Sequence, residues 1–241
     1  MSSIGIGGAK VDTVLDDPRV MAGGVLSARS IITMGSTAQI VRAVELQLVT
    51  HCLVEKGDTR VPAEILLTSG RVEPGPIAAG DTRELVFNID IPDAAPLSVG
   101  RTRTVLRTKL DIANAIDPKD SDEVIILPTR AMSAVLEGMQ AAGFRLATEE
   151  VEYNARRKQP FVQEFDFRPT GLGTFRFRVE EAEISFSPIR GGVEATLTVD
   201  RRVGLIQAGG ERKTKLKVRE ADLPNMDLAA ELRQAIALLA R

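Results

Sequence analysis

The chain has 241 residues, of which 44% are hydrophobic and 27% are charged, and its formal net charge at pH 7 is −2. This balanced composition is typical of a globular protein and argues against a nucleic-acid binder or a polybasic membrane module. The single histidine, His51, and the single cysteine, Cys52, exclude an intramolecular disulfide and zinc sites built from several Cys and His ligands.

Alternation of apolar and polar residues dominates the chain and predicts β-strands. In chain order, the clearest alternating segments are residues 44–48, 84–91, 161–168, 193–200 and 215–219. Glycine and proline turn signals lie between them. Half-buried strands of this kind suit antiparallel sheets with one dry face. The sequence therefore predicts an all-β fold built from β-sandwiches.

One short internal segment follows a helical period instead. In residues 130–142, apolar side chains recur from Met132 at i, i+3, i+4 and i+7. Thr129 suits the N-cap position, and Gly143 suits the position just after the helix. We expect one short amphipathic helix here.

A second amphipathic helix is predicted from about Asn225 to the C-terminal end. By default its apolar stripe docks on its own domain, and the alternative is dimerisation or binding of another protein. The stripe is therefore also the candidate partner or oligomer surface, formed by Leu228, Leu232, Ile236 and Leu239.

The two halves of the chain build their cores from different residues. Seven of the eight phenylalanines lie between Phe144 and Phe186. A polar, proline-containing stretch follows the long apolar segment 104–116, as is usual at a domain boundary. We therefore expect an N-terminal domain over residues 1–116, a linker over 117–129, and a C-terminal domain over 130–241.

The polar stretch also offers the only metal-ligand candidates that we single out. Asp117, Asp120 and Asp122 can supply carboxylate oxygens to Ca²⁺, although the run lacks the central glycine and terminal glutamate of an EF-hand loop. Acidic residues around a proline are also common turn formers. His51 and Cys52 are adjacent in a predicted strand and point to opposite faces, so they do not form one catalytic site.

A basic row occupies one face of a predicted strand near the C-terminal end. Such a row can meet anionic lipid or an acidic partner. A solvated strand face or the protection of a sheet edge is the more ordinary interpretation. The residues are Lys213, Lys215, Lys217 and Arg219.

Several ordered motifs resemble the sporulation-control protein M family of bacterial arrestin-like proteins. The match includes residues 7–13 and 44–50, is strongest at 109–112, 117–122 and 160–165, and continues to Asp200-Arg201-Arg202. The resemblance implies two immunoglobulin-like or arrestin-like β-sandwich domains in tandem. It also implies a regulatory adaptor without catalysis, acting in sporulation or cell-division control.

Arrestin-like proteins can hold their two domains together with charged groups. The resemblance therefore makes four charged residues candidates for polar contacts between the domains. These are Asp111 and Asp117 near the predicted junction, and Arg201 and Arg202 late in the second half.

From the residues and the resemblance together we expect a non-catalytic adaptor without a cofactor. Its partners are expected to be other proteins, including a second copy of itself, and not nucleic acid. No apolar run reaches the ~18 residues of a membrane span. The single thiol and the absence of a secretory signal pattern predict a cytoplasmic location. The alternative is a ligand- or calcium-responsive binding module.

Overall fold

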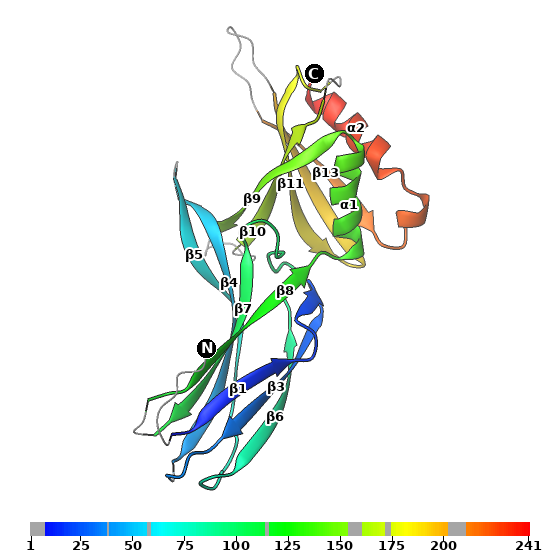
Figure 1. Ribbon diagram of the computed structural model, residues 1–241. Coiled ribbons are helices and arrows are strands. Elements are labelled where there is room, and N and C mark those ends of the chain that lie inside the picture. Colours follow the sequence, from blue (N-terminus) through cyan, green and yellow to red (C-terminus); the bar gives the residue numbers. More distant parts are fainter. Residues whose placement is uncertain are drawn as a thin grey trace. The chain divides into compact units, whose positions relative to one another are not determined.

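The structure is a computed structural model of the chain (Figure 1). It describes residues 8–37, 39–56, 59–113, 116–153, 161–171, 175–201 and 211–241. The chain divides into two compact units. The first contains Met1–Cys52, Pro62–Ser98 and Thr102–Leu127, and the second contains Leu53–Val61, Val99–Arg101 and Pro128–Arg241.

The first unit is a sandwich of two β-sheets (Figure 1). The smaller sheet has the order β1-β3-β6, with β1 at Lys10–Leu15, β3 at Val25–Thr33 and β6 at Thr82–Asp90. Within this unit the larger sheet has the order β4-β7-β8-β2, and β5 also pairs with β4. Its strands are β2 (Arg19–Met21), β4 (Val41–Lys56), β5 (Thr59–Val72), β7 (Arg103–Ile112) and β8 (Lys119–Leu127).

Strict alternation along the strands places one face of each sheet in the core. In β3 and β7 every second side chain is buried and the intervening ones are at least partly exposed. Period-two alternation puts successive side chains on opposite faces, so both sheets present an apolar face to each other. The largest fully buried side chains of this unit include Leu26, Ile32, Leu48, Leu106 and Leu110.

Polar groups join β1 to the larger sheet on one side of the sandwich. The buried Thr13 hydroxyl on β1 donates to the Thr108 hydroxyl on β7 at 2.8 Å and lies 2.9 Å from the Ser30 hydroxyl on β3. The Thr13 backbone N–H donates to the Asp120 carboxylate on β8 at 2.6 Å. Buried hydroxyls left without partners would cost about 1–3 kcal/mol each, so this chain of hydrogen bonds fixes how the sheets meet here.

The second unit is a five-stranded antiparallel meander with the order β13-β12-β11-β10-β9, and the end of β4 pairs with β9. Both helices cover one face of this sheet (Figure 1). The strands are β9 (Phe144–Tyr153), β10 (Phe161–Pro169), β11 (Val179–Ile189), β12 (Gly192–Arg201) and β13 (Arg212–Arg219). The helices are α1 (Arg130–Ala141), the 3-10 turn η1 (Leu223–Asn225) and α2 (Leu228–Leu239).

The helix caps follow the sequence closely. The Thr129 hydroxyl accepts a hydrogen bond from the Met132 N–H and caps α1, as predicted. The Asp227 carboxylate accepts from the Ala230 N–H and caps α2. Gly143, with φ +97°, follows α1 in the backbone region that favours glycine. The predictions of an all-β fold with one internal and one C-terminal helix are thus confirmed.

Two details of the sequence-based organisation are corrected. Residues 119–127, expected within a linker, form β8, which pairs with β7 in the first unit. Apolar and polar residues alternate in the second half of β8, where Val124 and Ile126 are buried. The polar first half of the strand makes this alternation difficult to recognise in the sequence. In the second unit, the described strands form one sheet, and helices take the place expected for a second sheet.

The C-terminal stripe is buried in its own unit. Leu228, Leu232 and Ile236 are 7%, 0% and 0% exposed, so they do not form the expected partner surface, whereas Leu239 is partly exposed. A Cβ atom on Gly138 of α1 would lie 2.9 Å from Leu232 Cδ1, which shows how closely the two helices approach. The stripe packs inward because the apolar face of the sheet needs a cover.

Removing the buried leucine of α2 should destabilise the second unit. We expect Leu232→Ala to lower the free energy of unfolding by about 2–5 kcal/mol, because it loses apolar burial and leaves a cavity. Leu238→Ala is the matched control, since Leu238 is 50% exposed. Urea denaturation of both variants is the measurement. An equal effect of the two substitutions would contradict the packing described for α2.

Candidate functional site

Strand β6 forms an open edge of the smaller sheet. It pairs with β3 along its whole length and is the last strand in the described sheet order. An edge strand presents a row of backbone N–H and C=O groups to any chain that can pair with it. With nine residues, β6 is long enough to accept another strand.

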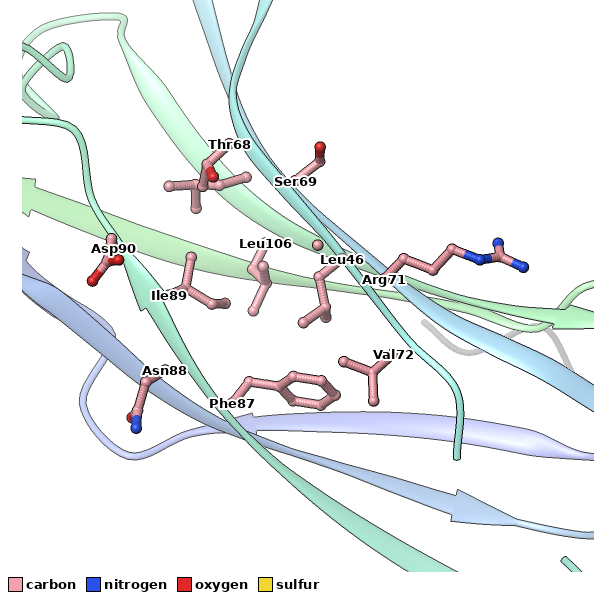
Figure 2. A pocket seen from close by; sticks show the side chains of 12 residues that line it. Leu46, Thr68, Ser69, Arg71, Val72, Phe87, Asn88, Ile89, Asp90 and Leu106 are labelled. Carbon is pink, nitrogen blue, oxygen red and sulfur yellow. The ribbon is translucent and has the colours of Figure 1, made fainter. Parts of the chain in front are cut away.

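A groove of about 300 Å³ lies beside β6, between the two sheets of the first unit (Figure 2). Figure 2 shows Phe87 and Ile89 from β6 and Val72 from β5 gathered around Leu46 and Leu106. The groove is thus bounded by two strands at the ends of their sheets, with the interior of the sandwich as its floor. The lining residues are Leu46, Leu48, Thr68, Ser69, Gly70, Arg71, Val72, Phe87, Asn88, Ile89, Asp90 and Leu106.

The floor of the groove is apolar because of the same alternation that builds the core. Leu46, Leu48 and Leu106 are 5%, 1% and 0% exposed, and Phe87 is 8% exposed. On β5, Gly70 leaves a gap in the wall, because a Cβ atom there would have no heavy atom within 4 Å. A glycine inside a strand commonly marks a place where another backbone or a ligand approaches closely.

The rim of the groove is polar. The guanidinium of Arg71 on β5 forms ion pairs with Glu45 and, at 3.0 Å, with Asp111. The Asn88 side chain on β6 accepts a hydrogen bond from the Ser27 hydroxyl at 3.0 Å. An apolar floor with a polar rim is the usual anatomy of a protein-interaction surface.

Other sheet edges carry features that discourage pairing. β2 has only three residues, and β13 carries the basic row that includes Lys213, Lys215 and Lys217. Short edge strands and lysines on an edge are established ways to block edge-to-edge association. β6 is nine residues long and has apolar Val86 69% exposed on its outer face. Of these strands, β6 is therefore the one best suited to pairing.

The uncovered face of the second unit is strongly acidic. A depression of about 200 Å³ is lined by six carboxylates and one threonine. Burial, and then the charges of nearby carboxylates, raise the pKa of Glu164 on β10 to about 8. Burial also raises the pKa of Glu183 on β11. The lining residues are Glu150, Asp166, Glu181, Glu183, Thr198, Asp200 and Glu211.

Comparison with known proteins places the chain in a family. A family model described as SpoOM protein, of the Spo0M family, matches residues 1–203. The chain belongs to the Spo0M family. It is 30% identical, over 245 residues, to the sporulation-control protein Spo0M of Bacillus subtilis (strain 168), covering 98% of this chain and 95% of that protein. The resemblance expected from the motifs is confirmed.

A solved structure gives the same result. The crystal structure of the sporulation control protein Spo0M from Bacillus subtilis matches with a TM-score of 0.84 and 28% sequence identity. The match covers 97% of this chain and 100% of that one. Both comparisons thus lead to a protein that is named for sporulation control.

The predicted carboxylates near the junction have partners within the first unit. Asp111 pairs with Arg71 and Arg42, and the Arg71 guanidinium, followed by that of Arg42, lowers the pKa of Asp111. Asp117 accepts the Ile112 N–H at 3.0 Å and pairs with Lys109 at 3.0 Å. The Ile112 hydrogen bond, followed by the Lys109 ion pair, lowers the pKa of Asp117. These contacts stabilise the end of β7, and a role between the domains stays a prediction.

The two predicted arginines are placed differently. Arg201 ends β12, and its guanidinium donates to the backbone oxygen of Arg241 at 3.2 Å. Its Nε atom is buried and has no hydrogen-bond partner among the described residues. Arg202 lies outside the described residues.

The calcium alternative finds no support in the described part of the chain. Asp117 pairs with Lys109, and Asp120 accepts the Thr13 N–H, so these two carboxylates serve the fold. Burial and the neighbouring Asp120 and Asp12 raise the pKa of Asp122 to about 6. No group of three or more His, Cys, Asp or Glu side chains among the described residues can hold a metal ion.

His51 and Cys52 have structural surroundings. The His51 ring lies 3.4 Å from the Glu64 carboxylate and 3.3 Å from the Arg107 guanidinium. Cys52 is 5% exposed, and a buried thiol of this kind is normally unreactive. Among the described residues, no helix is both long and apolar enough to span a membrane.

The stability of the second unit should fall as pH rises. A carboxylic acid with a raised pKa in the folded state binds more protons when folded, so the free energy of unfolding decreases from about pH 4.5 to about pH 8. Glu164→Gln should reduce this slope, with its largest stabilisation above pH 8. Urea denaturation at a series of pH values measures the slope.

Glu194→Gln is the matched control on the same face of the sheet. The Lys215 ammonium, at 2.6 Å, lowers the pKa of Glu194, so removing this charge should not stabilise the protein at high pH. A Glu164→Gln variant whose pH slope equals that of the wild type would contradict the electrostatic description of this face.

Proposed function

We propose that this Spo0M-family protein is a non-catalytic cytoplasmic adaptor in sporulation or cell-division control. It acts by binding other proteins at the groove beside β6. The name of the Bacillus subtilis relative, sporulation-control protein Spo0M, supports the biological setting. Cys52 is the one cysteine of the sequence and its side chain is buried, which agrees with a reducing compartment.

The observation that carries this proposal is the coincidence of a free strand edge with an apolar groove. Backbone groups of an edge strand supply affinity when an extended segment adds to a sheet, and pockets for alternate side chains supply selectivity. β6 offers the edge, and Leu46, Leu106 and Phe87 offer the apolar floor beside it. Both elements therefore lie where one extended segment can use them together.

The chemistry of the groove also favours binding over catalysis. Its lining contains two hydroxyl residues, Thr68 and Ser69, and neither His51 nor Cys52. Activation of a hydroxyl nucleophile needs a base within hydrogen-bond reach. No histidine or lysine belongs to this lining, and the one arginine, Arg71, is engaged by Glu45 and Asp111. The one carboxylate of the lining, Asp90, lies on the outer face of β6, opposite to Phe87 and Ile89. The proposal therefore assigns no reaction to the groove.

Filling the groove should abolish function without unfolding the protein. Gly70→Phe places a ring where a Cβ atom meets nothing within 4 Å, so we expect an unchanged or raised melting temperature. The variant should fail to complement a strain that lacks the gene, scored by sporulation and cell division. As a second readout, a photoreactive residue at position 88 should crosslink the otherwise wild-type protein to its partner. The same residue in the Gly70→Phe protein should give no crosslinked product.

Glu137→Phe, which adds the same ring to an exposed site on α1, is the matched control and should complement fully. Melting curves of both variants show whether each remains folded. Full complementation by a folded Gly70→Phe protein would overturn the proposed role of the groove.

A further inference from the structure

We infer that the partner of the β6 edge is an extended segment with a defined alternation. It carries apolar side chains at every second position and a basic residue at each end of a seven-residue stretch. This inference rests on the proposed function, because it names the chemistry of the segment that the groove receives.

The first step is the orientation of the β6 side chains. Leu85, Phe87 and Ile89 share the face toward the sandwich interior, and Phe87 and Ile89 line the groove. A strand added beside β6 continues the same pleat, so its residues opposite these positions also face inward. Those residues must be apolar to enter the groove without losing hydration.

The second step is the charge on the outer face. Glu84 and Asp90, six residues apart, are exposed and form no ion pair with a described residue. Their direct neighbours across the ladder on β3 are the uncharged Ile31 and Val25, and Arg29, which lies opposite Val86, pairs with Asp16 at 3.4 Å. The nearby Arg83 points its guanidinium at the backbone oxygens of Pro74 and Pro76.

Charge complementarity then sets the ends of the partner segment. Opposite charges directly across a ladder stabilise a sheet, and like charges destabilise it. An antiparallel segment therefore places one Lys or Arg opposite Asp90 and another opposite Glu84. Between these ends, a polar residue faces Asn88 and a β-branched residue faces Val86, which is 69% exposed.

The chain's own β13 has a similar alternation, with Lys213 and Arg219 six residues apart. Its Val218, however, is fully buried in the second unit, and Leu216 is only partly exposed. β13 is thus committed to its own sheet, where it pairs with β12. We therefore assign the groove to a segment of a different protein.

The test uses a labelled, end-blocked peptide, Lys-Val-Thr-Leu-Thr-Val-Lys, and the full chain at low ionic strength. Fluorescence anisotropy should show saturable binding. Glu84→Lys/Asp90→Lys should weaken it by about tenfold or more and should bind the acidic peptide Glu-Val-Thr-Leu-Thr-Val-Glu better than the basic one. Glu137→Lys/Glu180→Lys changes the net charge equally at exposed sites and should leave binding unchanged.

A second peptide tests the strand conformation, and the Gly70→Phe protein tests the location. The even-numbered residues of β6 direct their backbone groups to the free edge, because the odd-numbered ones bond to β3. Proline at the third peptide position, opposite Asn88, therefore removes a backbone donor that would point at β6 and should abolish binding. Gly70→Phe should abolish it as well, because the inward side chains lose their space.

No binding at millimolar peptide, or equal binding of both peptides by the wild type, would overturn the inferred pattern. The proposed adaptor function is overturned by a different result, which is complementation of the deletion strain by a folded Gly70→Phe protein. Light scattering tests whether the β6 edge is instead occupied by a second copy of this chain. A mass that rises with protein concentration and falls to the monomer in Glu84→Lys/Asp90→Lys would replace the separate partner by a second copy and overturn the inference.

Discussion

The terminal strand of a sheet leaves one row of backbone donors and acceptors unpaired, and this constraint explains how the first unit is built. β2 limits the exposed row to three residues, and β1 lies against β8, where Asp120 accepts the Thr13 N–H. β6 is nine residues long and has neither feature. A protein gains nothing in stability from such an edge, and it risks association. A binding partner that covers the β6 edge would explain why the protein keeps a long, unprotected edge beside an apolar groove.

The two sides of the sandwich differ in what lies between the sheets, which is buried hydrogen bonds on one side and an apolar space on the other. On the side of β1, Thr13, Ser30 and Thr108 form buried hydrogen bonds that have strict distance and direction. On the side of β6, Gly70 contributes no side chain, so the sheets leave a space of about 300 Å³ lined by leucines. Polar contacts thus fix the separation of the sheets at one side, and the apolar side remains able to receive side chains from another segment.

Much of the fold was accessible from the sequence because alternation and helical period are local signals. Both helices and the Thr129 cap were predicted correctly, and so was the all-β class. β8 was missed because Asp120 and Asp122 precede its buried half, and a local signal does not reveal that Asp120 has a backbone partner 107 residues away. The groove was missed for the same reason. Strand order is a property of long-range pairing, although a glycine within a strand, Gly70, was a signal that could have raised the question.

Separation of affinity and selectivity on the two faces of one strand explains why this site can belong to an adaptor. The inward positions of an added strand meet Leu46, Leu106 and Phe87, which accept most apolar side chains of suitable size. The outward positions meet Glu84 and Asp90, whose charges discriminate between segments that are equally apolar. Substitutions on the outer face can therefore change the partner without disturbing the core. At 30% identity, a relative can share the fold while differing in these outer residues, and the proposal then predicts a different partner segment for that relative.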